Sequence, residues 1–129
     1  MRVLLDTHVV YWLADDDSRV PEHIQDVIRT AAARYLSPAT AMEIALKSRR
    51  GRMPGGDRVI AGWAELRSEM LALDTELRVE HLSLAGSLDW EHRDPFDRIL
   101  VAQALVDGLT LVTKDRAIAR FRGVDTLSW

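Results

Sequence analysis

Acidic residues stand at positions along the chain where a carboxylate has no obvious local partner. Asp6 ends a short apolar run, Asp115 follows another such run, Glu43 lies in an otherwise apolar segment, and Asp94 and Asp97 precede a long one. Carboxylates gathered in one cleft repel one another unless a cation neutralises them, and all-oxygen sites select hard ions such as Mg²⁺ or Mn²⁺. Such an ion activates a water for attack on a phosphodiester, so the pattern indicates a phosphodiesterase.

Each of these acids also has a purely structural interpretation. Asp6 and Asp115 are suited to cap the helices that follow them, and the lone glutamate could face solvent on an amphipathic helix. Asp94 fits an N-cap best, because Pro95 would then occupy the first helical position and Asp97 the third. We therefore predict that Asp94 is mainly a helix cap and that Asp97 is mainly a metal ligand.

The elements that must position these acids are predicted from apolar patterning. Uniform apolar runs indicate buried parallel strands, and apolar spacings of three and four indicate helices. We expect strands at 2–5, 35–37, 77–82 and 109–113, with a candidate edge strand at 124–127. We expect helices at 7–13, 21–31, 39–47, 59–73, 95–106 and 115–121, and a loop at 53–57.

Alternating strands and helices predict an α/β fold with a mainly parallel sheet of four or five strands covered on both faces. Ligands of such sheets bind outside the carboxyl ends of the strands, at the switch point in strand order. Asp6 and Asp115 emerge from that edge, and the helices that carry Glu43 and Asp97 start there. The acids are therefore expected to converge.

Length and composition bound the possibilities further. The chain has 129 residues and is 47% hydrophobic, which suits a single domain over residues 1–129. No run is long enough to span a bilayer and no leader follows Met1, so we expect no membrane association. The absence of cysteine excludes disulfides and thiolate metal sites and fits a cytoplasmic location. The formal net charge is −3, so RNA binding would depend on local basic patches and bound cations.

Four motifs in this chain resemble the PIN-domain family, in particular the VapC-like toxins of bacterial toxin–antitoxin pairs. They are LLDTH at 4–8, SPA at 37–39 with MEIA at 42–45, HRDPFDRILVAQA at 92–104 and LVTKD at 111–115. The resemblance implies a three-layer α/β/α PIN-like fold and a Mg²⁺- or Mn²⁺-dependent endoribonuclease that cleaves RNA phosphodiester bonds with an activated water. It also implies a cognate antitoxin partner and a homodimer.

Matched position by position, the resemblance implies a catalytic and metal-binding set made of Asp6, Glu43, Asp97 and Asp115. Asp94 and Thr113 match supporting positions, Asp94 at an acidic position found in one branch of the family. His8 stands where many relatives carry asparagine or serine, so it is assigned no catalytic role.

Several cations lie beside these acids in the sequence. They are Arg93, Arg98, Lys114 and Arg116, with Lys47 at the end of the helix that carries Glu43. They could pair with the carboxylates or contact RNA phosphate or an acidic antitoxin segment, and Lys47 could simply be a solvated helix end. His81 and His92 are interpreted as packing or surface residues. The four tryptophans could stack bases, although isolated tryptophans more often belong to cores or interfaces.

Two other functions remain open from the residues alone. One is a PIN-like binding module without catalysis, which retained acids argue against but do not exclude. The other is a phosphoacceptor signalling domain, which needs an acidic pair after the first strand and an acceptor aspartate at the end of a middle strand. Asp6 stands alone, and the run at 77–82 ends without an aspartate.

Overall fold

The computed structural model describes residues 1–129 and contains one sheet of five strands. The strands are β1 (Arg2–Leu5), β2 (Ala33–Leu36), β3 (Leu73–Asp74), β4 (Thr110–Thr113) and β5 (Thr126–Ser128). Their order across the sheet is β3-β2-β1-β4-β5, and every neighbouring pair is parallel. The predicted mainly parallel sheet is confirmed.

The central strand β1 is buried on both faces, which explains its uniformly apolar sequence. Successive side chains of a strand point to opposite faces. Val3 and Leu5 accordingly pack in one hydrophobic cluster, and Leu4 packs in a second cluster on the other face. In β4 the paired residues divide in the same way, with Leu111 opposite Leu4 and Val112 opposite Leu5.

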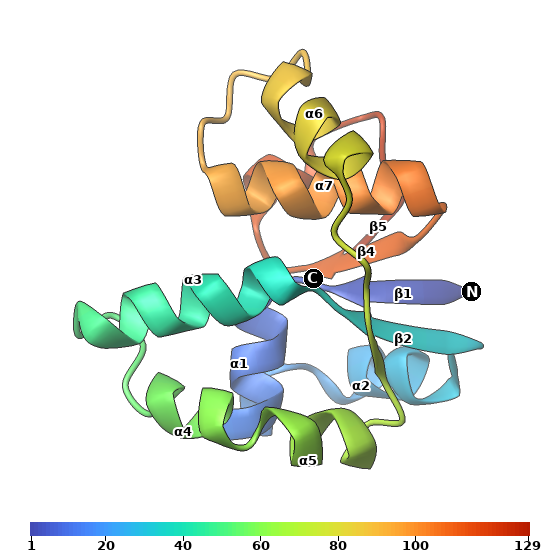
Figure 1. The fold of residues 1–129 in the computed structure, drawn as a ribbon. Helices are drawn as coiled ribbons and strands as arrows, with labels where there is room; N and C mark the ends of the chain where they lie inside the picture. The colour runs from blue at the N-terminus through green and yellow to red at the C-terminus, as the bar shows by residue number, and fades with distance from the viewer.

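Helices cover both faces of the sheet (Figure 1). They are α1 (Thr7–Asp15), α2 (Glu22–Thr30), α3 (Pro38–Arg49), α4 (Gly56–Ala61), α5 (Trp63–Glu69), α6 (Val79–Ser87), α7 (Pro95–Asp107) and α8 (Arg116–Ala119), with a 3-10 turn at Asp17–Arg19. Figure 1 shows α6 and α7 on one side of the sheet and α1, α2, α4 and α5 on the other. The three-layer α/β/α fold expected from the motifs is confirmed.

The strand predicted at 77–82 is wrong, because this segment begins helix α6. Two of its apolar residues are not buried: the exposed fraction is 84% for Val79 and 47% for Leu82. The buried residues of α6 are instead His81 and Ala85, one helical turn apart. His81 fixes the start of the helix by accepting the backbone N–H of Arg78 at Nδ1, at 2.9 Å.

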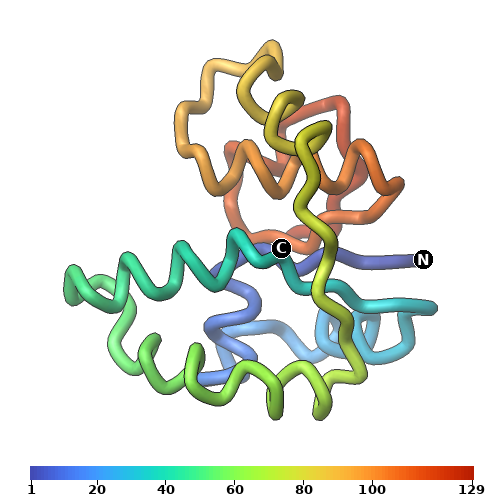
Figure 2. Tube along the Cα trace, viewed as in Figure 1, coloured from blue at the N-terminus to red at the C-terminus, as the bar shows by residue number.

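The third strand to appear in the chain is β3, which has only two residues, both exposed. It lies in the segment that leaves α5, passes the edge of the sheet and leads to α6 on the other side (Figure 2). The helix predicted at 59–73 is two helices, α4 and α5, which are separated at Gly62. None of the helices is both long and apolar enough to cross a membrane.

Candidate active site

The site lies at the switch point of the sheet, between β1 and β4. The chain moves from β1 toward β2 and β3 on one side, and β4 and β5 lie on the other. Asp6 directly follows β1, and Asp115 follows β4 by two residues. The Thr113 hydroxyl joins them, because it donates to Asp6 Oδ2 at 2.7 Å and accepts the Asp115 backbone N–H at 2.9 Å. The position predicted for a supporting hydroxyl therefore orients Asp6.

Glu43 lies on the inner side of α3 and has an exposed fraction of 2%, so the interpretation as a solvent-facing glutamate is wrong. Its Oε2 atom is 2.5 Å from Nζ of Lys47, one helical turn along α3. The other oxygen, Oε1, is buried and has no hydrogen-bond partner. A buried carboxylate oxygen left without a donor is costly, and a cation held against this atom would offset that cost.

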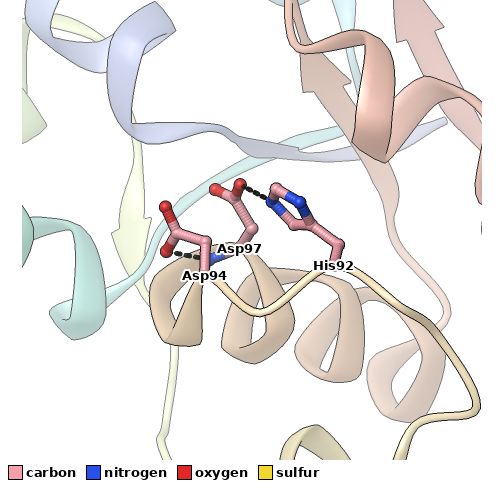
Figure 3. Close-up of side chains that lie close together, drawn as sticks. All are labelled: His92, Asp94 and Asp97. Carbon is pink, nitrogen blue, oxygen red and sulfur yellow. Dashed lines mark hydrogen bonds and ion pairs between the residues drawn. The ribbon is translucent and has the colours of Figure 1, made fainter.

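Asp94 and Asp97 begin α7 as predicted, with separate roles. Asp94 is the N-cap and accepts the backbone N–H groups of Phe96 at 2.9 Å and of Asp97 at 3.3 Å. Asp97 is buried, and its Oδ2 atom is 2.6 Å from Nε2 of His92 (Figure 3). The capping interpretation of Asp94 is confirmed, and the carboxylate of Asp97 takes no part in capping the helix.

Burial and like charge raise the pKa of two of these acids. The pKa of Asp6 rises from 3.8 to about 6, mainly because of burial, with hydrogen bonds from Thr113 and Thr7 opposing the rise and the charges of Glu43 and Asp115 adding to it. The pKa of Asp97 rises from 3.8 to about 7, mainly because of burial. The hydrogen bond with His92 opposes that rise, and the charges of Asp6, Asp94 and Asp115 add to it. The acids predicted from the sequence are thus close enough to repel one another.

The hydrogen bonds of Asp6, Asp97 and Asp115 leave each of these carboxylates with oxygen lone pairs that could bind a metal ion. Asp115 uses Oδ1 to cap α8 through Ala117 and Ile118, and its Oδ2 has no donor. Asp97 likewise engages only Oδ2, and Asp6 accepts one hydrogen bond at each oxygen, which leaves a lone pair on both. Capping and ligation are therefore compatible on the same carboxylate.

The donor set fits a hard divalent ion, because it consists of carboxylate oxygens and includes the unpartnered Oε1 of Glu43. The ligand atoms of His92, Asp94 and Asp97 all lie within 4.8 Å of one another, whereas no three of the four predicted acids do. Of the four predicted acids, this group contains Asp97 alone.

The family model of the PIN domain matches residues 3–124. This chain belongs to the PIN domain family. The ribonuclease VapC22 of Mycobacterium tuberculosis is 27% identical to it over 120 residues, which is 93% of this chain and 92% of that protein.

Solved structures share the PIN fold along the whole chain. DNA-bound VapBC from Salmonella typhimurium has a TM-score of 0.72 at 21% identity and covers 100% of this chain and 98% of its own. VapBC2 from Rickettsia felis, bound to a promoter DNA fragment, has a TM-score of 0.74 at 12% identity and covers 100% and 99%. These likenesses show the fold, and the family match sets aside the phosphoacceptor domain.

The cations predicted beside the acids of this PIN domain have different surroundings. Arg93, Lys114 and Arg116 are exposed and make no ion pair, so they are free to contact a ligand. Lys47 pairs with Glu43. Arg98 is a structural residue instead, since its guanidinium donates to the backbone carbonyls of residues 85, 88, 90 and 92. A phosphate contact at Arg98 is therefore not supported.

His92 is the site residue that the sequence interpretation missed. Its ring also packs against Trp90, with centroids 4.8 Å apart, and Trp90 in turn packs against Phe121. No local pattern in the sequence indicated this contact, which joins a residue before the Asp94 cap to a side chain in the first turn of α7. His81, by contrast, is the packing residue expected, fully buried and 3.0 Å from Asp107.

Proposed function

We propose that the protein is a metal-dependent endoribonuclease and the toxin of a toxin–antitoxin pair. The observation that carries the proposal is Oε1 of Glu43, a buried carboxylate oxygen without a partner. It lies among acids whose charges add to the raised pKa values of Asp6 and Asp97. Membership of the PIN domain family and the likeness to a protein named a ribonuclease support RNA as the substrate. A cleft of repelling carboxylates favours a bound cation over a neutral small molecule.

In this proposal Asp6, Glu43, Asp97 and Asp115 would hold Mg²⁺ or Mn²⁺. The ion would supply activation of the attacking water and neutralisation of charge on the phosphodiester. The chain's own residues prepare the site: Thr113 orients Asp6, and His92 orients Asp97. The exposed cations Arg93, Lys114 and Arg116 would bind flanking phosphates, which offsets the acidic net charge of the chain.

We further propose that residues 1–129 work as one domain in the cytoplasm, as a homodimer inhibited by a cognate antitoxin. The domain assignment rests on a single sheet that includes strands from both ends of the chain. The dimer is supported by exposed apolar residues on neighbouring helices: Val79 and Leu82 on α6, and Val106 on α7. Light scattering at micromolar concentration tests the dimer, and a monomer alone would contradict it.

Metal-dependent cleavage is the direct test of the proposed activity. Purified protein is incubated with several RNAs in Mn²⁺, in Mg²⁺ and in EDTA, beside an Asp6→Asn variant. We expect endonucleolytic products with metal, none in EDTA and none from the variant, with melting curves showing that the variant is folded. Unchanged cleavage in EDTA or by the folded variant would overturn the proposal. Binding of RNA or antitoxin without any cleavage would indicate the catalytically silent module.

A further inference from the structure

A cavity of about 250 Å³ opens directly beside the candidate metal ligands. It is lined by Asp6, His8, Trp12, Lys114 and Asp115. His8 and Trp12 stand four residues apart on α1, so they share one face of the helix, and their ring centroids are 5.6 Å apart. The cavity therefore has an aromatic wall on one helix, two carboxylates at the ends of the central strands, and a lysine.

Packing behind the aromatic wall holds it in place. The Arg19 guanidinium carbon is 4.7 Å from the Trp12 ring centroid, and Arg19 does not line the cavity. Trp129 meets Trp12 edge to face, with centroids 6.3 Å apart. The Nζ atom of Lys114 lies 5.6 Å from the Trp129 ring centroid, which ties the cavity's only cation to the same aromatic group. A wall ordered in this way loses little conformational freedom on binding.

The chemistry of these walls matches a nucleotide. Aromatic rings stack on the face of any base, and a lysine beside them attracts a phosphate. Bases in a duplex are already paired and stacked, whereas unpaired bases of a single strand can be splayed onto aromatic side chains. The acids Asp6 and Asp115 line the same cavity as these rings.

We propose that this cavity is a nucleobase subsite that takes one unpaired base of a single-stranded RNA. The base stacks on His8 and Trp12, Lys114 contacts an adjacent phosphate, and the scissile phosphate lies at Asp6 and Asp115. This inference rests on the proposed ribonuclease function and deepens it. It makes one base next to the cut a determinant of rate.

The test removes the base and the rings separately and together. A short single-stranded RNA that the protein cleaves is compared with versions that carry an abasic nucleotide at each position around the cut. The protein variants are His8→Ala, which alters an exposed residue, and Trp12→Leu, with melting curves to verify folding. Trp63→Leu is the matched control, because Trp63 packs against the same core cluster but lies outside the cavity.

We expect the wild type to lose roughly tenfold to a hundredfold in kcat/KM when one particular base is missing. His8→Ala and Trp12→Leu should lose a similar factor on the intact RNA and little more on that abasic RNA, because base and rings form one contact. Trp63→Leu should match the wild type on both. The subsite would be overturned if the loss from the missing base and the loss from His8→Ala or Trp12→Leu multiplied when combined. It would also be overturned if these two variants cleaved the intact RNA as the wild type does.

Binding in EDTA separates failure of the subsite from failure of the proposed function. If the wild type cleaves no RNA, the ribonuclease proposal fails, and fluorescence anisotropy of the labelled RNA still tests the cavity. Weaker binding by Trp12→Leu than by Trp63→Leu would support the subsite, and equal or undetectable binding would overturn it. Loss of antitoxin binding with unchanged RNA cleavage would assign the cavity to the antitoxin and overturn the inference as well.

Discussion

The Nζ atom of Lys47 lies 2.5 Å from Oε2 of Glu43, while Oε1 of the same carboxylate is buried without a partner. The side chain of Lys47 keeps about a quarter of its surface exposed, whereas that of Glu43 is almost fully buried. The lysine therefore neutralises an acid at the position where a divalent ion would also bind. The two cations share one carboxylate and should compete for it.

Lys47→Met should make the protein less stable in EDTA and a better metal binder. Glu43 would lose its only partner, which should cost about 1–3 kcal/mol of unfolding free energy. The same change removes a positive charge beside the site, so Mn²⁺ should bind several-fold more tightly. Denaturant unfolding and calorimetric titration measure the two effects. Arg49→Met is the matched control, since Arg49 is exposed on the same helix without an ion pair, and equal behaviour of both variants would refute the competition.

Asp94 and Asp97 should respond differently to the same substitution. Asparagine caps a helix as well as aspartate does, so Asp94→Asn should keep its stability and cleave RNA within about tenfold of the wild type. Asp97→Asn removes a charge that a metal ion needs, and we expect at least a ~100-fold loss of cleavage, beyond the range for residues that only support a ligand. Steady-state cleavage rates of the two folded proteins decide the matter. If Asp94→Asn is as inactive as Asp97→Asn, then Asp94 belongs among the ligands.

His92 should act by positioning the carboxylate of Asp97. His92→Ala removes the hydrogen bond to Oδ2, and we expect Mn²⁺ affinity to fall by roughly 10- to 100-fold. His92→Gln keeps an N–H donor and should recover part of the affinity, which loss of ring packing alone would not explain. Calorimetric titration gives the affinity without depending on activity, and His23→Ala, an exposed histidine on α2, is the control. Equal affinity in His92→Ala and wild type would rule out the positioning role.

Stability in EDTA should fall as pH rises from about 4 to about 7. Folding raises the pKa of Asp6 from 3.8 to about 6 and that of Asp97 to about 7, so within this window the folded state retains protons that the unfolded state has released. Below this pH window the two carboxyls are protonated in the folded and the unfolded protein alike. Above it they are ionised in both, and the stability that came from the protons retained in the folded state is lost. For Asp6 the shift corresponds to about 3 kcal/mol. Melting curves across this pH range measure the slope.

A bound divalent ion should restore the stability that the folded protein loses at neutral pH when its clustered carboxylates ionise. It binds the folded state and adds roughly 2.7 kcal/mol at a hundred times its dissociation constant. Asp97→Asn should melt higher than the wild type in EDTA, because one repelling charge is gone, yet gain much less from Mn²⁺ or Mg²⁺. Monovalent salt at matched ionic strength is the control. An equal metal shift in both proteins would mean that Asp97 does not hold the ion.

The parts of the fold that could be predicted are those that local rules determine. Asp94 and Pro95 fix the start of α7, and Gly108 ends it with a φ of 66°, a conformation that glycine adopts readily. Uniform apolar runs likewise located β1 and β4. Helix α6 could not be predicted in this way, because Leu77 and Val79 alternate with polar residues as in a strand, while the apolar residues Val79 and Leu82 of the helix are exposed.

The candidate site, too, could be predicted only where local rules or topology determine it. Strand ends and helix starts bring the acids to one edge, so their placement followed from topology. The partners of those acids did not follow, since the Lys47–Glu43 pair and the His92–Asp97 contact depend on side-chain directions that no local pattern specifies. Arg98 shows the same limit: the sequence left open whether it pairs with a carboxylate or contacts phosphate or antitoxin, and its donors are instead used by backbone carbonyls.

The hydrogen bond from Thr113 to Asp6 spans 107 positions of the chain and holds together strands β1 and β4, which are neighbours only in space. During synthesis, Asp6 and Glu43 leave the ribosome long before Thr113 and Asp115. Until β4 inserts beside β1, the centre of the sheet is incomplete and the carboxylates have no common edge on which to meet. A nascent chain that lacks β4 therefore lacks the Thr113 hydroxyl that orients Asp6, and it also lacks Asp115. The site can form only after β4 has been synthesised and has paired with β1.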